Sequence, residues 1–191
     1  MRITGGKIKG RKLKTRRGSL TRPLLSRVRK SLFDLIGDGI KRSTFLDLYA
    51  GSGAVGIEAL SRGARKVVFV EKDIASIRII RENLASCGLL SRAKIWQKDV
   101  LKFLPFLLKE ERFDFIFVAP PYFKGLQNRT LDIIERDADE AVVIVQHSSK
   151  ERVDFARGGV KIIRQRKYGD TVLTFLRTEH NDKGKAKTTA R

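Results

Sequence analysis

Three glycines and a downstream acid form the pattern in this sequence with the clearest chemical use. Gly51, Gly53 and Gly56 follow an apolar stretch and lead into a helical one. Glycines let the backbone approach a ligand closely, and the N–H groups at the start of a helix point towards it. Glu71 ends the next apolar stretch, about 20 residues after Gly51, the spacing at which a carboxylate binds the hydroxyls of a ribose. The pattern predicts a site for a cofactor that contains a nucleoside.

Acidic residues around the glycines distinguish between two such cofactors. The glycine motif also fits a nicotinamide dinucleotide, but Asp47, four residues before Gly51, would repel a pyrophosphate. S-adenosylmethionine instead offers an ammonium to Asp47, a ribose to Glu71 and an adenine amino group to Asp99. The carboxylates therefore favour S-adenosylmethionine; the alternatives are a nicotinamide dinucleotide and a glycine turn that binds no ligand. The predicted cofactor-binding residues are Asp47, Tyr49, Ala50, Gly51, Ser52, Gly53, Glu71, Lys72, Asp99 and Val100.

A second reactive segment, residues 119–122, follows another apolar stretch. Consecutive prolines keep the backbone extended, so that the Pro120 carbonyl can accept a hydrogen bond from a substrate N–H. Tyr122 offers a flat surface for a base removed from its stack. Methyl transfer to an exocyclic amine suits this segment, because hydrogen-bond acceptors would orient a weakly nucleophilic nitrogen towards the methyl group. The predicted catalytic residues are Ala119, Pro120, Pro121 and Tyr122.

The charge of the chain predicts a polyanionic partner. The formal net charge is +20, with 41 Lys and Arg against 21 Asp and Glu. A protein this basic binds nucleic acid through the release of counterions from the contacted phosphates. The excess is concentrated in residues 1–42, which hold 14 Lys or Arg and two Asp. We therefore predict a nucleic-acid contact surface in this segment, with a solvated basic arm as the alternative.

Length and composition predict one soluble domain with tails. The 191 residues are 41% hydrophobic, which is enough for one sizeable core. No apolar run approaches the length of a membrane span, and no signal peptide is recognisable, so we expect a cytoplasmic protein without membrane contact. Cys87 is the only cysteine and there are two histidines, which argues against a disulfide and against a zinc site. We expect a monomer without a metal.

The elements that must position these residues alternate between strand and helix. Short β-rich stretches occur at residues 44–48, 66–70, 94–97, 113–118 and 141–146, and helical stretches at 54–62, 74–87, 100–109 and 126–136. This alternation predicts an α/β fold with a doubly wound, Rossmann-like parallel sheet. Residues 160–166 and 171–176 predict an antiparallel hairpin at one edge, as in class I methyltransferases. An amphipathic helix is expected over residues 27–40.

The chain resembles the bacterial 16S ribosomal RNA guanine-N2-methyltransferase family over nearly its whole length. The matching segments are Arg2-Ile-Thr-Gly-Gly6, Lys9-Gly-Arg11, Arg22-Pro23, Arg27-Val-Arg29, Leu32-Phe33, residues 46–53, residues 58–63 and Tyr168-Gly-Asp170. The resemblance implies a methyltransferase that uses S-adenosylmethionine on a guanine of small-subunit rRNA. Charge, pattern and composition divide the chain into three expected parts, namely a basic arm and helix (1–42), a methyltransferase domain (43–178) and a basic tail (179–191). The expected RNA-binding residues are Arg11, Lys12, Arg22, Arg27 and Arg29.

The sequence departs from this family at the reactive segment. The family usually begins its catalytic tetrapeptide with Asp or Asn, whose oxygen accepts a hydrogen bond from the target amine, whereas this chain has Ala119. Loss of such an acceptor costs about 2–4 kcal/mol of activation free energy. Three readings follow: an active enzyme in which another oxygen substitutes, a weak enzyme, or a catalytically silent RNA-binding protein. A nicotinamide oxidoreductase is the remaining alternative.

Overall fold

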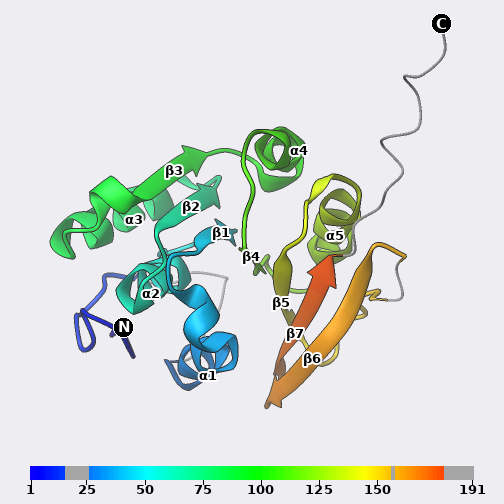
Figure 1. Cartoon of the computed structure of the whole chain (residues 1–191), viewed down its shortest axis with the longest axis horizontal. Coiled ribbons are helices and arrows are strands. Elements are labelled where there is room, and N and C mark those ends of the chain that lie inside the picture. Colours follow the sequence, from blue (N-terminus) through cyan, green and yellow to red (C-terminus); the bar gives the residue numbers. More distant parts are fainter. Residues whose placement is uncertain (16–25, 156–157, 179–191) are drawn as a thin grey trace, which may run out of the picture.

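The computed structural model describes residues 1–15, 26–155 and 158–178. Its centre is one seven-stranded sheet with the strand order β3-β2-β1-β4-β5-β7-β6 (Figure 1). The strands are β1 (Thr44–Leu48), β2 (Lys66–Glu71), β3 (Ala93–Gln97), β4 (Phe115–Val118), β5 (Val142–Ser148), β6 (Val160–Tyr168) and β7 (Thr171–Thr178). Strands β1 to β5 are parallel, and β7 pairs antiparallel with both β5 and β6. The predicted parallel sheet with a C-terminal antiparallel hairpin is confirmed.

Five α-helices surround this sheet within the described residues. They are α1 (Ser26–Ile36), α2 (Ala54–Arg62), α3 (Ile74–Ser86), α4 (Val100–Glu110) and α5 (Leu126–Asp137), with short 3-10 turns at Gly37–Ile40 and Leu90–Arg92. The helix expected over residues 27–40 therefore ends four residues early. Gly37 adopts a left-handed conformation with φ 62°, which interrupts the α-helix and starts the 3-10 turn.

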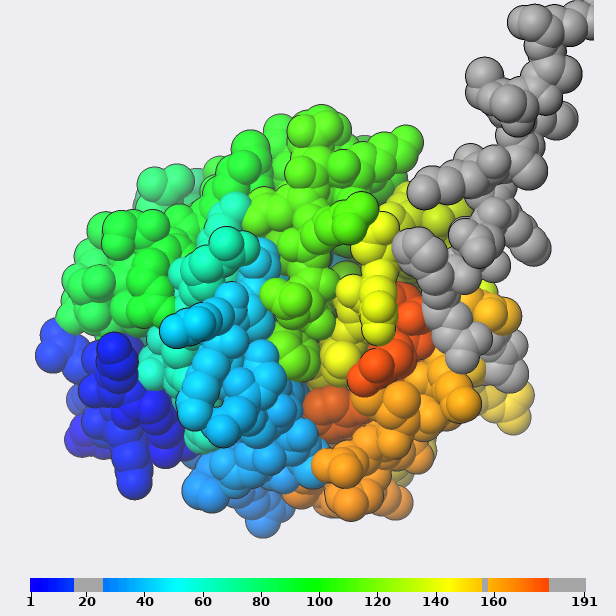
Figure 2. All heavy atoms as spheres, in the orientation of Figure 1, coloured from blue at the N-terminus to red at the C-terminus, as the bar shows by residue number. Residues whose placement is uncertain are grey.

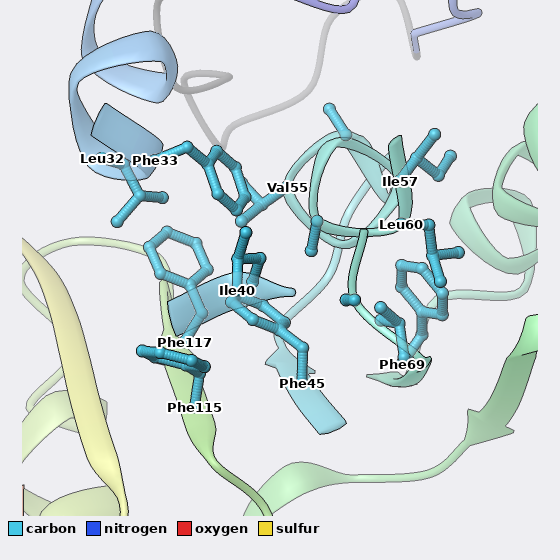
Figure 3. Packing of buried hydrophobic residues seen from close by; sticks show 14 of the residues in the cluster. Leu32, Phe33, Ile40, Phe45, Val55, Ile57, Leu60, Phe69, Phe115 and Phe117 are labelled. Atoms are coloured by element: carbon cyan, nitrogen blue, oxygen red, sulfur yellow. The ribbon is translucent and has the colours of Figure 1, made fainter. Parts of the chain in front are cut away.

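Two apolar clusters form the core, one on each face of the sheet. Helices α1, α2 and α3 contribute to the first cluster, and Figure 3 shows Phe33, Phe45, Phe69 and Phe115 packed within it. Helices α4 and α5 contribute to the second. Successive side chains of β1 alternate between the two clusters, with Phe45 in the first and Leu46 in the second. Asp47 therefore points to the same face as Phe45, towards α2.

The first 15 residues form a hairpin-like segment that packs on the main fold. Arg2 and Lys12 form an antiparallel bridge, and Ile3 and Leu13 are each 2% exposed within the first apolar cluster. Figure 2 shows this segment in dark blue beside α2 and α3, at the opposite end of the molecule from β6 in orange. The hairpin-like geometry is as expected, and the described part of residues 1–42 shares a core with the rest of the chain. The predicted tail, residues 179–191, lies outside the described residues.

Candidate active site

The two reactive segments meet where the strand order reverses. Strands β1 and β4 are neighbours, yet the chain leaves β1 towards β2 on one side and β4 towards β5 on the other. In open α/β sheets, ligands bind at the carboxyl ends of the strands at this switch point. The glycine turn follows β1, and residues 119–122 follow β4. The sheet thus brings the predicted cofactor and catalytic segments to one edge.

The turn after β1 has a backbone that needs its glycines. Gly51 and Gly53 have φ of 55° and 74°, which glycine adopts without steric cost. Tyr49 also has a positive φ, 58°, a strained conformation for a residue with a side chain. Its hydroxyl forms a 2.8 Å hydrogen bond with Thr130 Oγ1, which holds the turn against α5. A Cβ atom on Gly56 would lie 2.3 Å from the ring of Phe69, so only glycine lets α2 pack this close to β2.

Glu71 is oriented towards the glycine turn by backbone groups. Its Oε2 accepts a 2.9 Å hydrogen bond from Gly51 N–H, and its Oε1 accepts from the N–H groups of Lys72 and Asp73 at 2.8 and 3.0 Å. A carboxylate offers about four acceptor positions, so one remains for a ligand hydroxyl. A Cβ atom on Gly51 would meet nothing within 4 Å, which leaves open space beside this carboxylate.

Asp47 is buried beneath the same turn, with 1% of its surface exposed. Its Oδ2 accepts a 2.9 Å hydrogen bond from Gly56 N–H in the first turn of α2. Burial raises the pKa of the Asp47 carboxyl to about 8, against the opposing effect of the Gly56 hydrogen bond, and the nearby charge of Glu71 raises the pKa further. The ammonium contact expected from the sequence stays a prediction, because the observed partner of Asp47 is a backbone N–H.

This buried carboxyl should make the stability of the protein depend on pH. Its pKa is about 8 in the folded protein and 3.8 in its unperturbed state, so between these values the folded protein retains a proton that the unfolded chain has lost. Its stabilising contribution is therefore complete below pH 3.8 and is lost as the pH rises to about 8. Asp47→Asn keeps an oxygen for Gly56 and should be about 1–2 kcal/mol more stable than wild type at pH 8. Urea unfolding of both proteins at pH 5 and pH 8 measures this difference in stability. An equal change in the free energy of unfolding between the two pH values in wild type and Asp47→Asn would contradict the prediction.

The other predicted cofactor residues differ in exposure and in their hydrogen-bond partners. Asp99 is exposed and caps α4, with Oδ1 accepting from Lys102 N–H at 3.3 Å, and Val100 is 4% exposed in the second apolar cluster. Ala50 N–H donates to the Val70 carbonyl. The Ser52 carbonyl accepts a 3.0 Å hydrogen bond from Asn83 Nδ2. Asn83 also binds the backbone of Lys14, so it joins the N-terminal segment to the turn.

A cavity of about 880 Å³ lies beside the tetrapeptide 119–122. Its described lining residues are Lys72, Ala119, Pro120, Pro121, Tyr122, Phe123, Lys124, Leu126, Gln146, Ser148, Lys150 and Asp170. All four predicted catalytic residues therefore face one space, together with Lys72 of the predicted cofactor set. The Tyr122 hydroxyl accepts a 2.9 Å hydrogen bond from Gln146 Nε2. This bond fixes the ring at the edge of the cavity.

Glu151 holds the segment that follows the tetrapeptide, a role that the sequence did not indicate. Its carboxylate accepts from Phe123 N–H at 2.7 Å and from Gln127 Nε2 at 2.8 Å. Phe123 has a positive φ of 59° and is 64% exposed. Gln146 and Ser148 could have been suspected, because they end β5 at the same edge of the sheet. Glu151 lies in a loop, where spacing carries no such signal.

The predicted RNA-binding residues fall into three groups. Arg11, Lys12 and Arg27 are exposed, and Arg11 donates to the Ser86 carbonyl. Arg22 lies outside the described residues. The prediction for Arg29 is wrong: this side chain is fully buried and forms a 2.9 Å ion pair with Glu58, so it cannot reach a phosphate. Glu58 also accepts from Thr4 and from Arg62, and this network joins the N-terminal segment and α1 to α2.

The described residues offer neither a metal site nor a membrane span. They contain no cluster of three or more His, Cys, Asp and Glu side chains that could hold a metal ion. Within residues 1–15, 26–155 and 158–178, no helix is both long enough and apolar enough to span a membrane.

Comparison with known proteins assigns the fold to a class. A solved structure of Escherichia coli yhhF, provisionally titled a methyltransferase, superposes with a TM-score of 0.81 at 29% identity, covering 94% of this chain and 98% of that one. The mixed sheet with its antiparallel C-terminal strands and its glycine turn at the switch point is the class I methyltransferase fold. This assignment sets aside the nicotinamide oxidoreductase alternative.

The chain belongs to the family described as Conserved hypothetical protein 95, whose profile matches residues 1–177. YlbH of Bacillus subtilis (strain 168), provisionally named an rRNA methyltransferase, is 33% identical over 175 residues, which cover 90% of this chain and 95% of YlbH. Ribosomal RNA small subunit methyltransferase D of Escherichia coli (strain K12) is 36% identical over 149 residues, covering 76% and 74% of the two chains.

Proposed function

We propose that this protein transfers a methyl group from S-adenosylmethionine to the exocyclic N2 amine of a guanine in small-subunit rRNA. The observation that carries the proposal is the meeting of two segments at the switch point of the sheet in a chain of this family. One is the glycine turn with its oriented Glu71, and the other is the cavity lined by the tetrapeptide 119–122. The relatives named as rRNA methyltransferases support the substrate class. We further propose that the protein carries out this reaction as a monomer in the cytoplasm.

The residues of the glycine turn fit the nucleoside of this cofactor. Glu71 keeps a free acceptor position next to Gly51, where open space is available for a ribose. Asp99, exposed at the start of α4, would accept from the adenine amino group. An ammonium near Asp47 would favour the ionised form of its buried carboxyl. When bound, the cofactor supplies an activated methyl group, and the protein supplies alignment.

The tetrapeptide would hold the target base. No group in the described part of the chain donates a hydrogen bond to the Pro120 carbonyl, which is therefore available to one N–H of the target amine. Tyr122, held by Gln146, would stack on the base. We assign the phosphate contacts to the exposed Arg11, Lys12 and Arg27, and to Lys124 and Lys150 beside the cavity.

The proposal is tested by incubating the protein with S-adenosylmethionine labelled in its methyl group and small ribosomal subunits that lack the modification. We expect label in the rRNA, and mass spectrometry of digested RNA should identify N2-methylguanosine. Absence of incorporation together with measurable RNA binding would favour the alternative, a catalytically silent RNA-binding protein, for which Ala119 is the specific observation. Calorimetry with S-adenosylhomocysteine tests the cofactor site separately.

A further inference from the structure

The cavity beside the tetrapeptide has a single acidic side chain among its described lining residues, that of Asp170. An exocyclic amine has two N–H groups and a lone pair that is delocalised into its ring. Acceptors for both hydrogens would orient the nitrogen, and the Pro120 carbonyl accounts for one of them. Ala119 begins the tetrapeptide but has no polar atom in its side chain. A second acceptor must come from elsewhere in the cavity.

Among the neutral polar side chains of the cavity, Gln146 keeps an amide oxygen without a hydrogen bond to the described residues, and the oxygens of the other two are engaged. The Tyr122 hydroxyl oxygen accepts from Gln146 Nε2 at 2.9 Å, and Ser148 Oγ accepts from Lys150 N–H at 3.2 Å. The carboxylate of Asp170, in contrast, has no hydrogen bond or ion pair with any group in the residues that the structure describes. A carboxylate is also the stronger acceptor, because hydrogen bonds to a charged oxygen are about twice as strong as neutral ones.

The backbone around Asp170 is fixed in place. Gly169 and Asp170 form the two-residue loop between β6 and β7, with Gly169 in the left-handed conformation at φ 60°. The Asp170 carbonyl accepts a 2.8 Å hydrogen bond from Ser149 N–H, just after β5. On the other side of the loop, the Tyr168 hydroxyl is hydrogen-bonded to Ser31 of α1. These two contacts hold the backbone of the loop at the edge of the cavity, and the exposed side chain of Asp170 extends from it.

We propose that Asp170 is a catalytic residue that accepts a hydrogen bond from the target exocyclic amine, in a site where Ala119 supplies no acceptor. This proposal rests on the proposed function. As the lone pair of the amine nitrogen forms a bond to the methyl carbon, the methyl–sulfur bond of the donor would break and leave its electrons on sulfur, so the nitrogen must lose one proton and keep the electrons of that N–H bond. The proton passes from the nitrogen to a carboxylate oxygen of Asp170 and from there to water. The loop that carries Asp170 thus takes part in the reaction and also connects β6 to β7.

The first test is a set of variants assayed for methyl transfer to unmodified small subunits. Asp170→Ala should lower kcat about 100-fold, and Asp170→Asn, which keeps a neutral acceptor oxygen, about tenfold. Affinity for S-adenosylhomocysteine should stay within twofold of wild type in both variants. The double variant Ala119→Asp/Asp170→Ala should have a kcat at least tenfold higher than that of Asp170→Ala. Asp38→Ala, which removes an exposed carboxylate paired with Lys41, is the matched control and should have no effect. Activity of Asp170→Ala within twofold of wild type would overturn the proposal.

A second test does not depend on turnover. Inosine 5′-monophosphate lacks the exocyclic amine of guanosine 5′-monophosphate, so wild-type protein saturated with S-adenosylhomocysteine should bind the guanosine nucleotide at least threefold more tightly. In Asp170→Ala only the Pro120 carbonyl is left to accept from the amine, so the preference for the guanosine nucleotide should shrink. Equal binding by wild type, or unchanged discrimination in the variant, would overturn the role of Asp170. If wild type discriminates but transfers no methyl group, the proposed function fails while the amine contact stands.

Discussion

Replacing Glu71 with Gln should weaken the binding of S-adenosylhomocysteine roughly 30- to 100-fold. Glu71 is held by three backbone N–H groups, among them that of Gly51, and offers its remaining acceptor position to a ribose hydroxyl. Charge-assisted hydrogen bonds are worth about 1.5–3 kcal/mol each, and 2–3 kcal/mol corresponds to this loss of affinity. The amide of Gln would also turn an N–H group towards one of the backbone donors. Isothermal titration calorimetry measures the change.

A matched control separates this effect from a change in surface charge. Glu82 lies on α3, is half exposed and pairs with Lys14, so Glu82→Gln removes the same charge away from the glycine turn and should leave the affinity unchanged. The 2′-deoxy analogue of the ligand refines the test. It should bind wild type more weakly than the parent ligand does, and the difference should shrink in Glu71→Gln. Equal affinities of wild type and Glu71→Gln would show that Glu71 does not contact the ribose.

Replacing Arg29 with Ala should lower the free energy of unfolding by about 3 kcal/mol, because it leaves the buried carboxylate of Glu58 without its closest cationic partner. Both side chains are fully buried, and their 2.9 Å contact joins α1 to α2. Thr4 and Arg62 still contact Glu58, which limits the loss. A change of this size is a large fraction of the stability of a typical domain. Urea unfolding followed by circular dichroism measures it.

Arg27 provides the control for this prediction, since it lies two residues away on α1 and is exposed. Arg27→Ala should change stability by less than about 0.5 kcal/mol and should instead weaken RNA binding. Replacing Arg29 and Glu58 together with Met and Leu should cost less than Arg29→Ala alone, because no unpaired charge stays buried. A stable Arg29→Ala protein with impaired RNA binding would restore the interpretation of Arg29 as a phosphate contact.

Much of the fold could be predicted because its signals are local. The apolar stretches that become β1, β2 and β4 are short and bounded by turn residues, and their alternation with helices limits the topology. The edge hairpin was indicated by the β-rich stretches 160–166 and 171–176, which are joined across residues 167–170. The end of α1 was misjudged, because the apolar pattern continues to Ile40 while the backbone changes at Gly37.

The sequence predicted which segments form the site, but it predicted fewer of the contacts that their side chains make. Gly51, Glu71 and Pro120 could be recognised because their chemistry depends on spacing along the chain. Arg29 could not be distinguished from the exposed Arg27, since its partner Glu58 is distant in sequence. A signal was present, however. Glu58 is an acid in a helix whose residues 54–61 are all buried, and a buried acid requires a partner. The sequence marked Asp170 only as part of a segment that resembles the family, because its place in the cavity depends on how β5, β6 and β7 pair.

The contact between Gly56 and Phe69 links two positions in the evolution of this chain. A methyl group on Gly56 would lie 2.3 Å from the Phe69 ring and 2.8 Å from Val67, so Ala at position 56 is incompatible with an unchanged β2. Descendants can therefore replace this glycine only when residue 69 becomes smaller and Val67 also gives way. A lineage that retains the large ring at 69 must also retain the glycine.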